Sequence, residues 1–294
     1  MEDFNDWIKI IRQTEFNQVF NYLIIDKQII LFDISSHKTV RIIADFPPNY
    51  LIISHFHLDH QTGKNLLKKR YKSKIVAHEL ESNSIENLQG FYHNYNFLNG
   101  TDLINELHLK YWHFKDIKVD IKVYDNYEFN IGTHILKVIH TPGTTPGHIC
   151  LFDEENRILF AGDMGPKELP VYNAITSNLT QYLNSYDKII KINPCIVLSA
   201  HFPPIFEKVK QAYIKAKERI IKRENRILEI LEKKKSLTLD EIASENPTIP
   251  KKPGNSIILN WLKFAEKIQT LHHLNKLAKE NKVKSDDNFR WELI

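Results

Sequence analysis

The feature that most limits how this chain can fold is the segment Ser54–His60 (SHFHLDH), which places four potential metal ligands within six residues. The segment follows the apolar run 50–54 (YLIIS), which does not alternate and therefore predicts a strand covered on both faces. A loop that leaves a strand can point alternate side chains into one cavity, and imidazole and carboxylate ligands suit zinc, iron or manganese. This spacing predicts a metal site rather than a solvated surface. The four ligands are His55, His57, Asp59 and His60.

Strands and helices alternate from Trp7 to about residue 205, which indicates an α/β domain. The irregular segment 79–115 is rich in aromatic residues and predicts either a helical lid over a site or a packing insert. The turn 141–147 has two prolines and two glycines and cannot continue a strand. The expected helices cover 63–71 and 179–192, and the expected strands include 29–33, 74–77, 149–153, 157–163 and 195–201.

The composition is typical of a globular protein, with 42% apolar and 26% charged residues. The apolar runs are too short to cross a bilayer, and no basic stretch followed by an apolar run opens the sequence. We therefore expect neither membrane contact nor a secretory signal. Cys150 and Cys195 both lie in apolar, strand-like contexts, which predicts buried thiols in a reducing compartment rather than a disulfide. These features together predict a cytoplasmic protein.

The spacing HxHxDHxxG over residues 55–63 resembles the signature of the metallo-β-lactamase superfamily, and other segments follow in the order that this family would require. The resemblance extends over about residues 7–206. It implies a four-layer αβ/βα sandwich with the site at one edge, between the two sheets. The segment 178–189 (NLTQYLNSYDKI) is similar to a helix of hydrolases of the glyoxalase II type. The other matching segments are Asp33 at the end of an apolar strand, 141–148 (TPGTTPGH), 161–163 (AGD) and 199–204 (SAHFPP).

The resemblance implies one or two divalent cations, with zinc expected and manganese or iron as alternatives. A water molecule between two such cations loses a proton near neutral pH. Asp59 would be both a ligand and the catalytic group that orients the hydroxide or passes its proton to the leaving group. The implied ligands of metal 2 are Asp59, His60, Asp163 and His201, and those of metal 1 are His55, His57 and the shared Asp163.

One position departs from the family pattern. Thr144 stands where the second motif usually carries the third histidine of metal 1, and a neutral hydroxyl is a poor zinc ligand beside imidazole and carboxylate. His148 or His140 could supply the missing ligand, water could fill the gap, or the chain could bind a single metal. We expect looser binding at metal 1.

One tyrosine and three further histidines are weaker candidates for the functional site. Tyr172, shortly after Asp163, could reach the cavity and bind a substrate oxygen. His78 follows a strand and is expected in a turn or behind the ligands. His272 and His273 are adjacent on an expected helix and so face different directions, which favours surface or core roles.

Residues 205–294 differ in charge from the rest, with 20 Lys and Arg against 13 Asp and Glu, a net charge of +7. We expect a helix over 207–233, a strand and helix over 236–244, a helix over 256–281 and a hairpin over 282–293. This order is typical of a winged helix-turn-helix. The segment resembles the winged-helix domain of lactamase-β-2-like hydrolases, some of which act on single-stranded RNA. We therefore divide the chain into a metallo-β-lactamase-like domain (1–206) and a linking helix with a winged-helix-like domain (207–294).

Basic side chains of the C-terminal segment could form a phosphate track, as winged helices use to bind nucleic acid. Acidic residues at 266, 280, 286 and 287 interrupt this track. Its predicted members are Lys251, Lys252, Lys263, Lys267, Lys276, Lys279, Lys282 and Lys284.

The leading hypothesis is a hydrolase that uses a metal-activated water on an ester, thioester or lactone of a small molecule. A second hypothesis is an endoribonuclease, with RNA held by the winged helix. A third is a mononuclear iron oxygenase that uses His55, His57 and Asp163. A fourth is a binding protein whose site has decayed at Thr144. A homodimer is a further expectation.

Overall fold

The computed structural model describes residues 1–13, 18–96, 102–103, 105, 114–167, 170–245, 248 and 256–294, with the side chains of 256–258 left out. Within the aromatic-rich segment 79–115, residues 97–101, 104 and 106–113 lie outside the described residues. So do Pro247, Pro250 and Pro253, and two members of the basic track, Lys251 and Lys252.

The first sheet has seven strands in the order β1-β2-β3-β4-β5-β6-β7. Strands β1 to β4 pair antiparallel, and β4 to β7 pair parallel. The strands are β1 (Glu2–Asp3), β2 (Ile8–Gln13), β3 (Val19–Ile25), β4 (Ile29–Phe32), β5 (Tyr50–Ile52), β6 (Lys74–His78) and β7 (Ile121–Val123).

The second sheet has five strands in the order β12-β11-β10-β9-β8, antiparallel except for the parallel pair β11–β12. Its strands are β8 (Glu128–Asn130), β9 (Ile135–His140), β10 (Ile149–Asp153), β11 (Ile158–Gly162) and β12 (Ile196–Ser199).

Apolar side chains that alternate along the strands of the first sheet cover both of its faces. On β5, Leu51 packs into the core under the N-terminal helices, whereas Ile52 packs into the core between the sheets. This two-sided burial explains why the segment shows no polar alternation. The helices on the first sheet are α1 (His37–Ile42), α2 (Lys64–Tyr71), α3 (Ser82–Glu86) and α4 (Leu88–His93).

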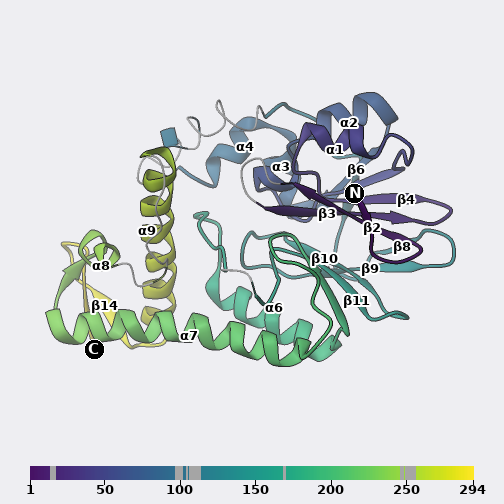
Figure 1. Ribbon diagram of the computed structural model, residues 1–294. Helices are drawn as coiled ribbons and strands as arrows, with labels where there is room; N and C mark the ends of the chain where they lie inside the picture. Colours follow the sequence, from purple (N-terminus) through teal and green to yellow (C-terminus); the bar gives the residue numbers. More distant parts are fainter. Residues whose placement is uncertain are drawn as a thin grey trace.

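The second sheet packs its other face against α6 (Leu179–Ile192) and the first half of α7 (Val209–Lys234). The layers are therefore helix, sheet, sheet and helix (Figure 1). The predicted four-layer sandwich is confirmed. Cys150 is buried as predicted, but Cys195 is exposed, because it lies in the turn before β12 begins rather than inside the strand.

The C-terminal unit has the predicted order of elements, and its three strands form a small sheet in the order β13-β15-β14. Its core contains Ile227 and Leu231 from the second half of α7. Helix α7 thus contributes side chains to two hydrophobic cores. The predicted domain boundary at residue 206 stays a prediction. The elements after α7 are β13 (Leu237–Thr238), α8 (Leu239–Ser244), α9 (Ser256–Lys279), β14 (Val283–Ser285) and β15 (Arg290–Leu293).

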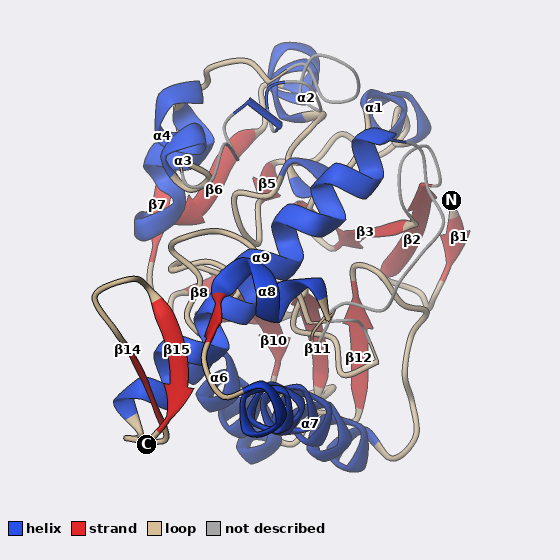
Figure 2. Ribbon diagram, turned by 90° about the vertical axis from the view of Figure 1, so that its left-hand side faces the viewer, coloured by secondary structure: helices blue, strands red, loops and turns tan. Residues whose placement is uncertain are grey.

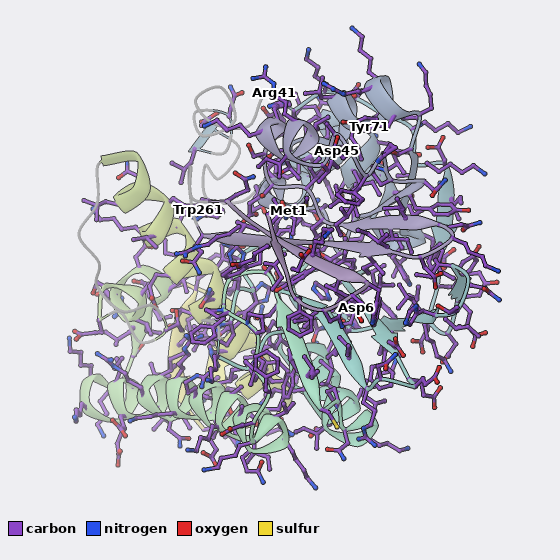
Figure 3. The ribbon with its side chains drawn as sticks, turned by 45° about the vertical axis from the view of Figure 1, so that its right-hand side comes forward. Met1, Asp6, Arg41, Asp45, Tyr71 and Trp261 are labelled. Atoms are coloured by element: carbon purple, nitrogen blue, oxygen red, sulfur yellow. The ribbon has the colours of Figure 1, made fainter. Side chains whose placement is uncertain are left out.

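Helix α9 ties the C-terminal unit to the sandwich. Leu274 and Leu277 pack in the C-terminal core, whereas Phe264 and Ile268 pack in the core under the N-terminal helices. Figure 2 shows α9 crossing in front of the sandwich, and Figure 3 shows Trp261 on the side of α9 that faces it. None of the described helices is long and apolar enough to span a membrane.

Candidate metal centre

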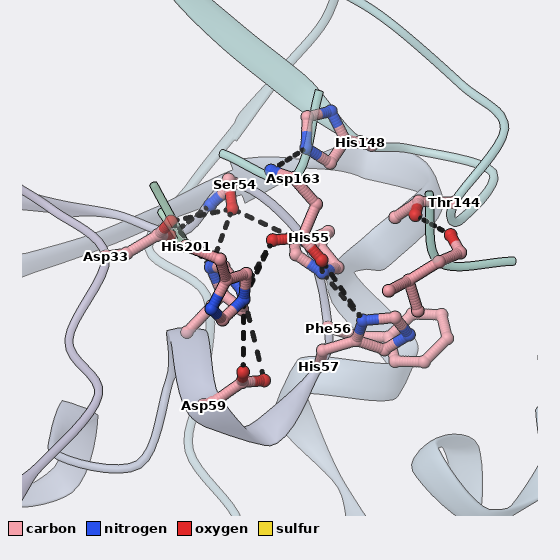
Figure 4. Close-up of polar contacts among 12 residues, drawn as sticks. Asp33, Ser54, His55, Phe56, His57, Asp59, Thr144, His148, Asp163 and His201 are labelled. Atoms are coloured by element: carbon pink, nitrogen blue, oxygen red, sulfur yellow. Dashed lines mark hydrogen bonds and ion pairs between the residues drawn. The ribbon is translucent and has the colours of Figure 1, made fainter. Parts of the chain in front are cut away.

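Loops that follow three strands bring the predicted ligands together (Figure 4). The histidine cluster follows β5 and ends in the short 3-10 helix η1 (Leu58–His60). Asp163 directly follows β11, and His201 lies two residues beyond β12. Because β11 and β12 are parallel neighbours, their carboxyl ends place these two residues at the same edge.

Gly162 determines where Asp163 points. Its φ of +51° lies in the left-handed region that favours glycine. A Cβ at this position would lie 2.7 Å from His148 Nε2 and 3.0 Å from Ser54 Cβ. The backbone conformation and the tight packing both require glycine here.

Four side chains form the first ligand set: Asp59, His60, Asp163 and His201. Asp163 Oδ1 lies 3.1 Å from His60 Nε2 and 3.2 Å from His201 Nε2. Asp59 lies 3.4 Å from His201 Nε2 through Oδ2 and 3.8 Å from His60 Nε2 through Oδ1. A tetrahedral ion bound at zinc distances requires ligand atoms about 3.3–3.6 Å apart. The spacing of this set therefore fits one small cation.

The hydrogen bonds of the histidines also fit a cation. His60 donates from Nδ1 to Asp33 Oδ2 (2.8 Å), and His201 donates from Nδ1 to the Gln18 carbonyl (3.0 Å). With the proton held on Nδ1, each ring can offer the lone pair of Nε2 to a cation beside Asp163. Apart from the ion pairs of Asp163 with His60 and His201, the buried atoms His60 Nε2 and Asp163 Oδ1 have no hydrogen-bond partner among the described residues. Buried polar atoms in that state are costly unless something binds them, and a metal ion would.

A second, smaller set lies beside the first. His55 Nε2 lies 2.8 Å from His57 Nδ1 and 3.4 Å from Asp163 Oδ2, and His57 Nδ1 lies 3.8 Å from the same oxygen. His55 Nδ1 donates to Ser54 Oγ (2.9 Å), which leaves its Nε2 unprotonated. Asp163 thus faces one histidine set with each carboxylate oxygen, as a bridging ligand would.

Asp33 supports the centre from behind. Its Oδ1 accepts from Ser54 N (2.7 Å), and its Oδ2 accepts from Ser54 Oγ (2.8 Å) and from His60 Nδ1. Its φ is +62°, which aspartate tolerates better than most residues. A carboxylate that holds a ligating histidine in this way fixes the tautomer and the ring orientation.

The electrostatics favour positive charge next to Asp163. Burial lowers the pKa of His60, but Asp163, Asp33 and Asp59 outweigh it and hold that pKa well above its usual value. Burial raises the pKa of Asp163, but the imidazoles of His60, His55 and His201 outweigh it and hold that pKa well below its usual value. The carboxylates therefore stabilise a cation at this point, whether a proton or a metal ion.

His148 lies beside His55, with their ring centroids 5.0 Å apart. Its Nε2 accepts from the backbone N–H of Asp163 (3.2 Å), and its Nδ1 donates to Thr141 Oγ1 (2.8 Å). Both ring nitrogens are therefore engaged. The alternative in which His148 is a metal ligand does not fit this arrangement, in which His148 positions Asp163.

Glu81 is a residue that the sequence analysis missed. Its Oε2 accepts from Phe56 N (2.7 Å) and its Oε1 from Gly147 N (2.6 Å), so it joins the histidine loop to the turn 141–147. The carboxyl is fully buried, and burial raises its pKa to about 7. No motif marks this glutamate, because its partners are far away in sequence.

The predicted substrate contact of Tyr172 is not supported. The side chain is fully buried, and its hydroxyl interacts with His273 Nε2 (2.9 Å) and accepts from Arg223 Nη1 (3.1 Å). His273 is buried as expected for a core residue, and His272 donates to the Ala174 carbonyl (2.9 Å). Tyr172 thus joins α7 and α9 to the segment after Asp163.

His78 lies at the end of β6, where its Nδ1 accepts from Leu80 N (3.2 Å). Its ring stacks on that of His140 at 4.2 Å between centroids. Burial, with His140 nearby, lowers the pKa of His78 to about 4. This is the turn role that the sequence predicted.

Most described lysines of the basic track have acidic partners. Lys267 pairs with Asp240, and Lys276 pairs with Glu224 inside the protein. Lys282 and Lys284 also pair with glutamates of the same unit. These pairs reduce the positive charge that the track would offer to phosphates.

Comparisons with known proteins agree with this geometry. The family model for the metallo-beta-lactamase superfamily matches residues 15–201. A beta-lactamase-like protein 2 homolog from Caenorhabditis elegans is 24% identical over 262 residues, which is 88% of this chain and 75% of the relative. The crystal structure of a metallo-beta-lactamase family protein from Thermus thermophilus superposes with a TM-score of 0.76 at 18% identity, covering 99% of this chain and 100% of the other. That likeness concerns the fold.

Two relatives with names that specify a reaction match less of the chain. The acyl-coenzyme A thioesterase MBLAC2 from Bos taurus is 21% identical over 149 residues, 49% of this chain and 51% of the relative. A hydroxyacylglutathione hydrolase from Rhizobium johnstonii is 26% identical over 114 residues, 39% of this chain and 32% of the relative.

Proposed function

Because the chain belongs to the metallo-beta-lactamase superfamily, we propose that it is a metal-dependent hydrolase that cleaves an ester, thioester or lactone of a small molecule. The observation that carries this proposal is the convergence of candidate ligands around His60: one group joins His60 to His55 and Asp163, and the other joins it to Asp59 and His201. Asp163 Oδ1 also lies 3.2 Å from His201 Nε2, which links the two groups. We further propose zinc as the native metal, because the first ligand set combines two imidazoles with two carboxylates, which are ligands that zinc takes in proteins.

A divalent cation at this centre would lower the pKa of a bound water toward neutrality and polarise the substrate carbonyl. The residues of the chain divide the remaining tasks. Asp163 and His60 are almost fully buried and hold the centre rigid, whereas the Asp59 side chain is 24% exposed. We therefore assign to Asp59 the transfer of a proton between the attacking water and the leaving group, because it is the carboxylate of the set that substrate and solvent can reach.

Thioesters are the substrate class that we place first. The printed names of two relatives are an acyl-coenzyme A thioesterase and a hydroxyacylglutathione hydrolase, and both names specify hydrolysis of an acylated thiol. These relatives support the glyoxalase II type only loosely, because each aligns with about half of this chain or less. The substrate therefore remains part of the proposal.

The competing hypotheses have less support. An oxygenase site with two histidines and one carboxylate needs open positions around the iron, whereas further imidazole and carboxylate groups from His60, His201 and Asp59 crowd this centre. RNA cleavage would rely on the basic track, and most of its described lysines are paired with carboxylates. The expected homodimer stays a prediction.

The experiment is a turnover assay of the purified chain with zinc or manganese against acyl thioesters, small lactones and single-stranded RNA. We expect thioester or lactone hydrolysis that falls about 100-fold or more in Asp59→Asn, the range for loss of a general acid–base group. Asp45 is an exposed residue three positions after the end of α1. Asp45→Asn is therefore the matched control and should retain full activity. Equal activity of Asp59→Asn and the wild type would contradict the proposal. RNA cleavage alone, with binding that weakens steeply with salt, would replace it with the nuclease hypothesis.

A further inference from the structure

The two ligand sets of the centre are not equivalent. The first set has four protein ligands, Asp59, His60, Asp163 and His201. The second has three, His55, His57 and the other oxygen of Asp163. The fourth ligand of the second set would have to come from position 144, from a neighbouring histidine or from solvent.

Thr144 is fixed in a conformation that does not serve the second set. Its hydroxyl donates to the Val171 carbonyl, and its own carbonyl accepts from Ser177 Oγ (2.7 Å). Both partners belong to residues 171–178, which we call the strap. The strap also pairs with the neighbouring turn through Asn178 N and the Gly143 carbonyl (2.9 Å). The hydroxyl of Thr144 is thus hydrogen-bonded to the backbone of the strap.

The strap itself is anchored from several sides. Asn94 of the segment after α4 accepts from Ile175 N through its carbonyl (2.8 Å) and from Thr176 Oγ1 through its side chain (2.7 Å). Helix α9 holds the strap at Tyr172 and Ala174 through His273 and His272. A strap held in this way keeps Thr144 where it is, because moving the threonine would break buried hydrogen bonds.

Neither nearby histidine replaces the missing ligand. His148 uses Nε2 and Nδ1 on Asp163 and Thr141. His140 donates from Nε2 to the Pro146 carbonyl (2.9 Å), and its ring stacks on His78. The second set therefore has three protein ligands in this fold.

We propose that the centre binds metal unequally, with one permanent ion in the Asp59–His60–Asp163–His201 set and one labile ion in the His55–His57–Asp163 set. The inference rests on the proposed metal-dependent function and adds which half of the centre retains its metal. Loss of a residue that merely supports a ligand lowers metal affinity about 10–100-fold. Loss of a whole histidine ligand should cost at least as much, so we expect the two dissociation constants to differ by at least ~10-fold.

The test is a zinc titration of the full-length apo-protein by calorimetry, with the metal content measured after dialysis. We expect one tight equivalent that survives dialysis and one weak equivalent that does not. His57→Ala should remove the weak equivalent and keep the tight one, whereas His201→Ala should remove the tight one. Circular dichroism establishes that each variant is folded.

Thr144→His tests the inference in the opposite direction, because a histidine there would complete the second set and should narrow the gap between the two affinities. Since Thr144 is buried, the titrations of His57→Ala and His201→Ala keep the proposal testable if this variant does not fold. Two equally tight equivalents in the wild type, or loss of the tight one in His57→Ala, would overturn the inference and leave the proposed function intact. Absence of any bound metal would overturn both.

Discussion

Replacing Asp33 by asparagine should weaken metal binding although Asp33 is not itself a proposed ligand. The carboxylate accepts hydrogen bonds at both oxygens, from Ser54 N at one and from Ser54 Oγ and His60 Nδ1 at the other. An asparagine offers one oxygen and one NH₂ group, so in either orientation a donor faces a donor. If the amide nitrogen faces His60, the ring must accept at Nδ1 and carry its proton on Nε2, which can then no longer bind metal.

The size of the effect follows from this geometry. Mutation of a group that orients a metal ligand typically lowers metal affinity 10–100-fold, or about 1.4–2.7 kcal/mol. We expect a loss in this range for Asp33→Asn at the tight site. The φ of +62° at this position should not add backbone strain, because asparagine adopts the left-handed region as readily as aspartate does.

The assay is a competition titration of zinc between the protein and a chelating dye, with thermal stability measured in parallel. Asp26→Asn is the matched control, because Asp26 also accepts from a histidine, His134 Nδ1 at 2.9 Å, as well as from Thr133. That variant should lose stability and keep its zinc affinity. An unchanged affinity in Asp33→Asn, or an equal drop in both variants, would refute the reasoning.

Three further predictions concern the surroundings of the centre. Burial raises the folded-state pKa of Glu81 from 4.5 to about 7, so the stability that this group contributes should fall as the pH rises from about 4.5 to 7. Glu81→Gln should flatten this pH dependence of the free energy of unfolding, measured by denaturant titration. The same pH dependence in the variant and the wild type would contradict this. Gly162→Ala should destabilise the fold and lower zinc affinity, because its Cβ would meet His148 Nε2 at 2.7 Å; a variant with wild-type melting temperature and affinity would count against the packing argument. Tyr172→Phe should cost about 1–3 kcal/mol in unfolding experiments, because Arg223 loses a buried acceptor, and a loss below about 0.5 kcal/mol would show that water replaces the hydroxyl.

The sequence predicted the parts of the centre that are encoded locally. The cluster from His55 to His60 shares one loop, so its ligands are visible as a spacing. The strand before it is visible because both of its faces are apolar. Asp163 and His201 carry no such local signal, and only the resemblance to a known family connected them to the cluster.

The residues that the sequence did not reveal depend on contacts between distant segments. Glu81 accepts from residues 25 and 66 positions away, and Tyr172 meets His273 across 101 positions. No periodicity or motif records such pairs. For the same reason, the sequence suggested that Tyr172 reaches the cavity, whereas in the fold its side chain is buried against α9. The basic track was predicted from charge alone, and the acidic partners of its lysines appeared only with the packing of the C-terminal unit.

The measurement that tests the central claim most directly is an anomalous diffraction experiment on crystals of the zinc-loaded chain. The account predicts the strongest peak about 2.0–2.2 Å from His60 Nε2, His201 Nε2 and an oxygen of Asp163, with a weaker peak next to His55 and His57. A crystal in which the only zinc peaks lie away from these side chains would contradict it.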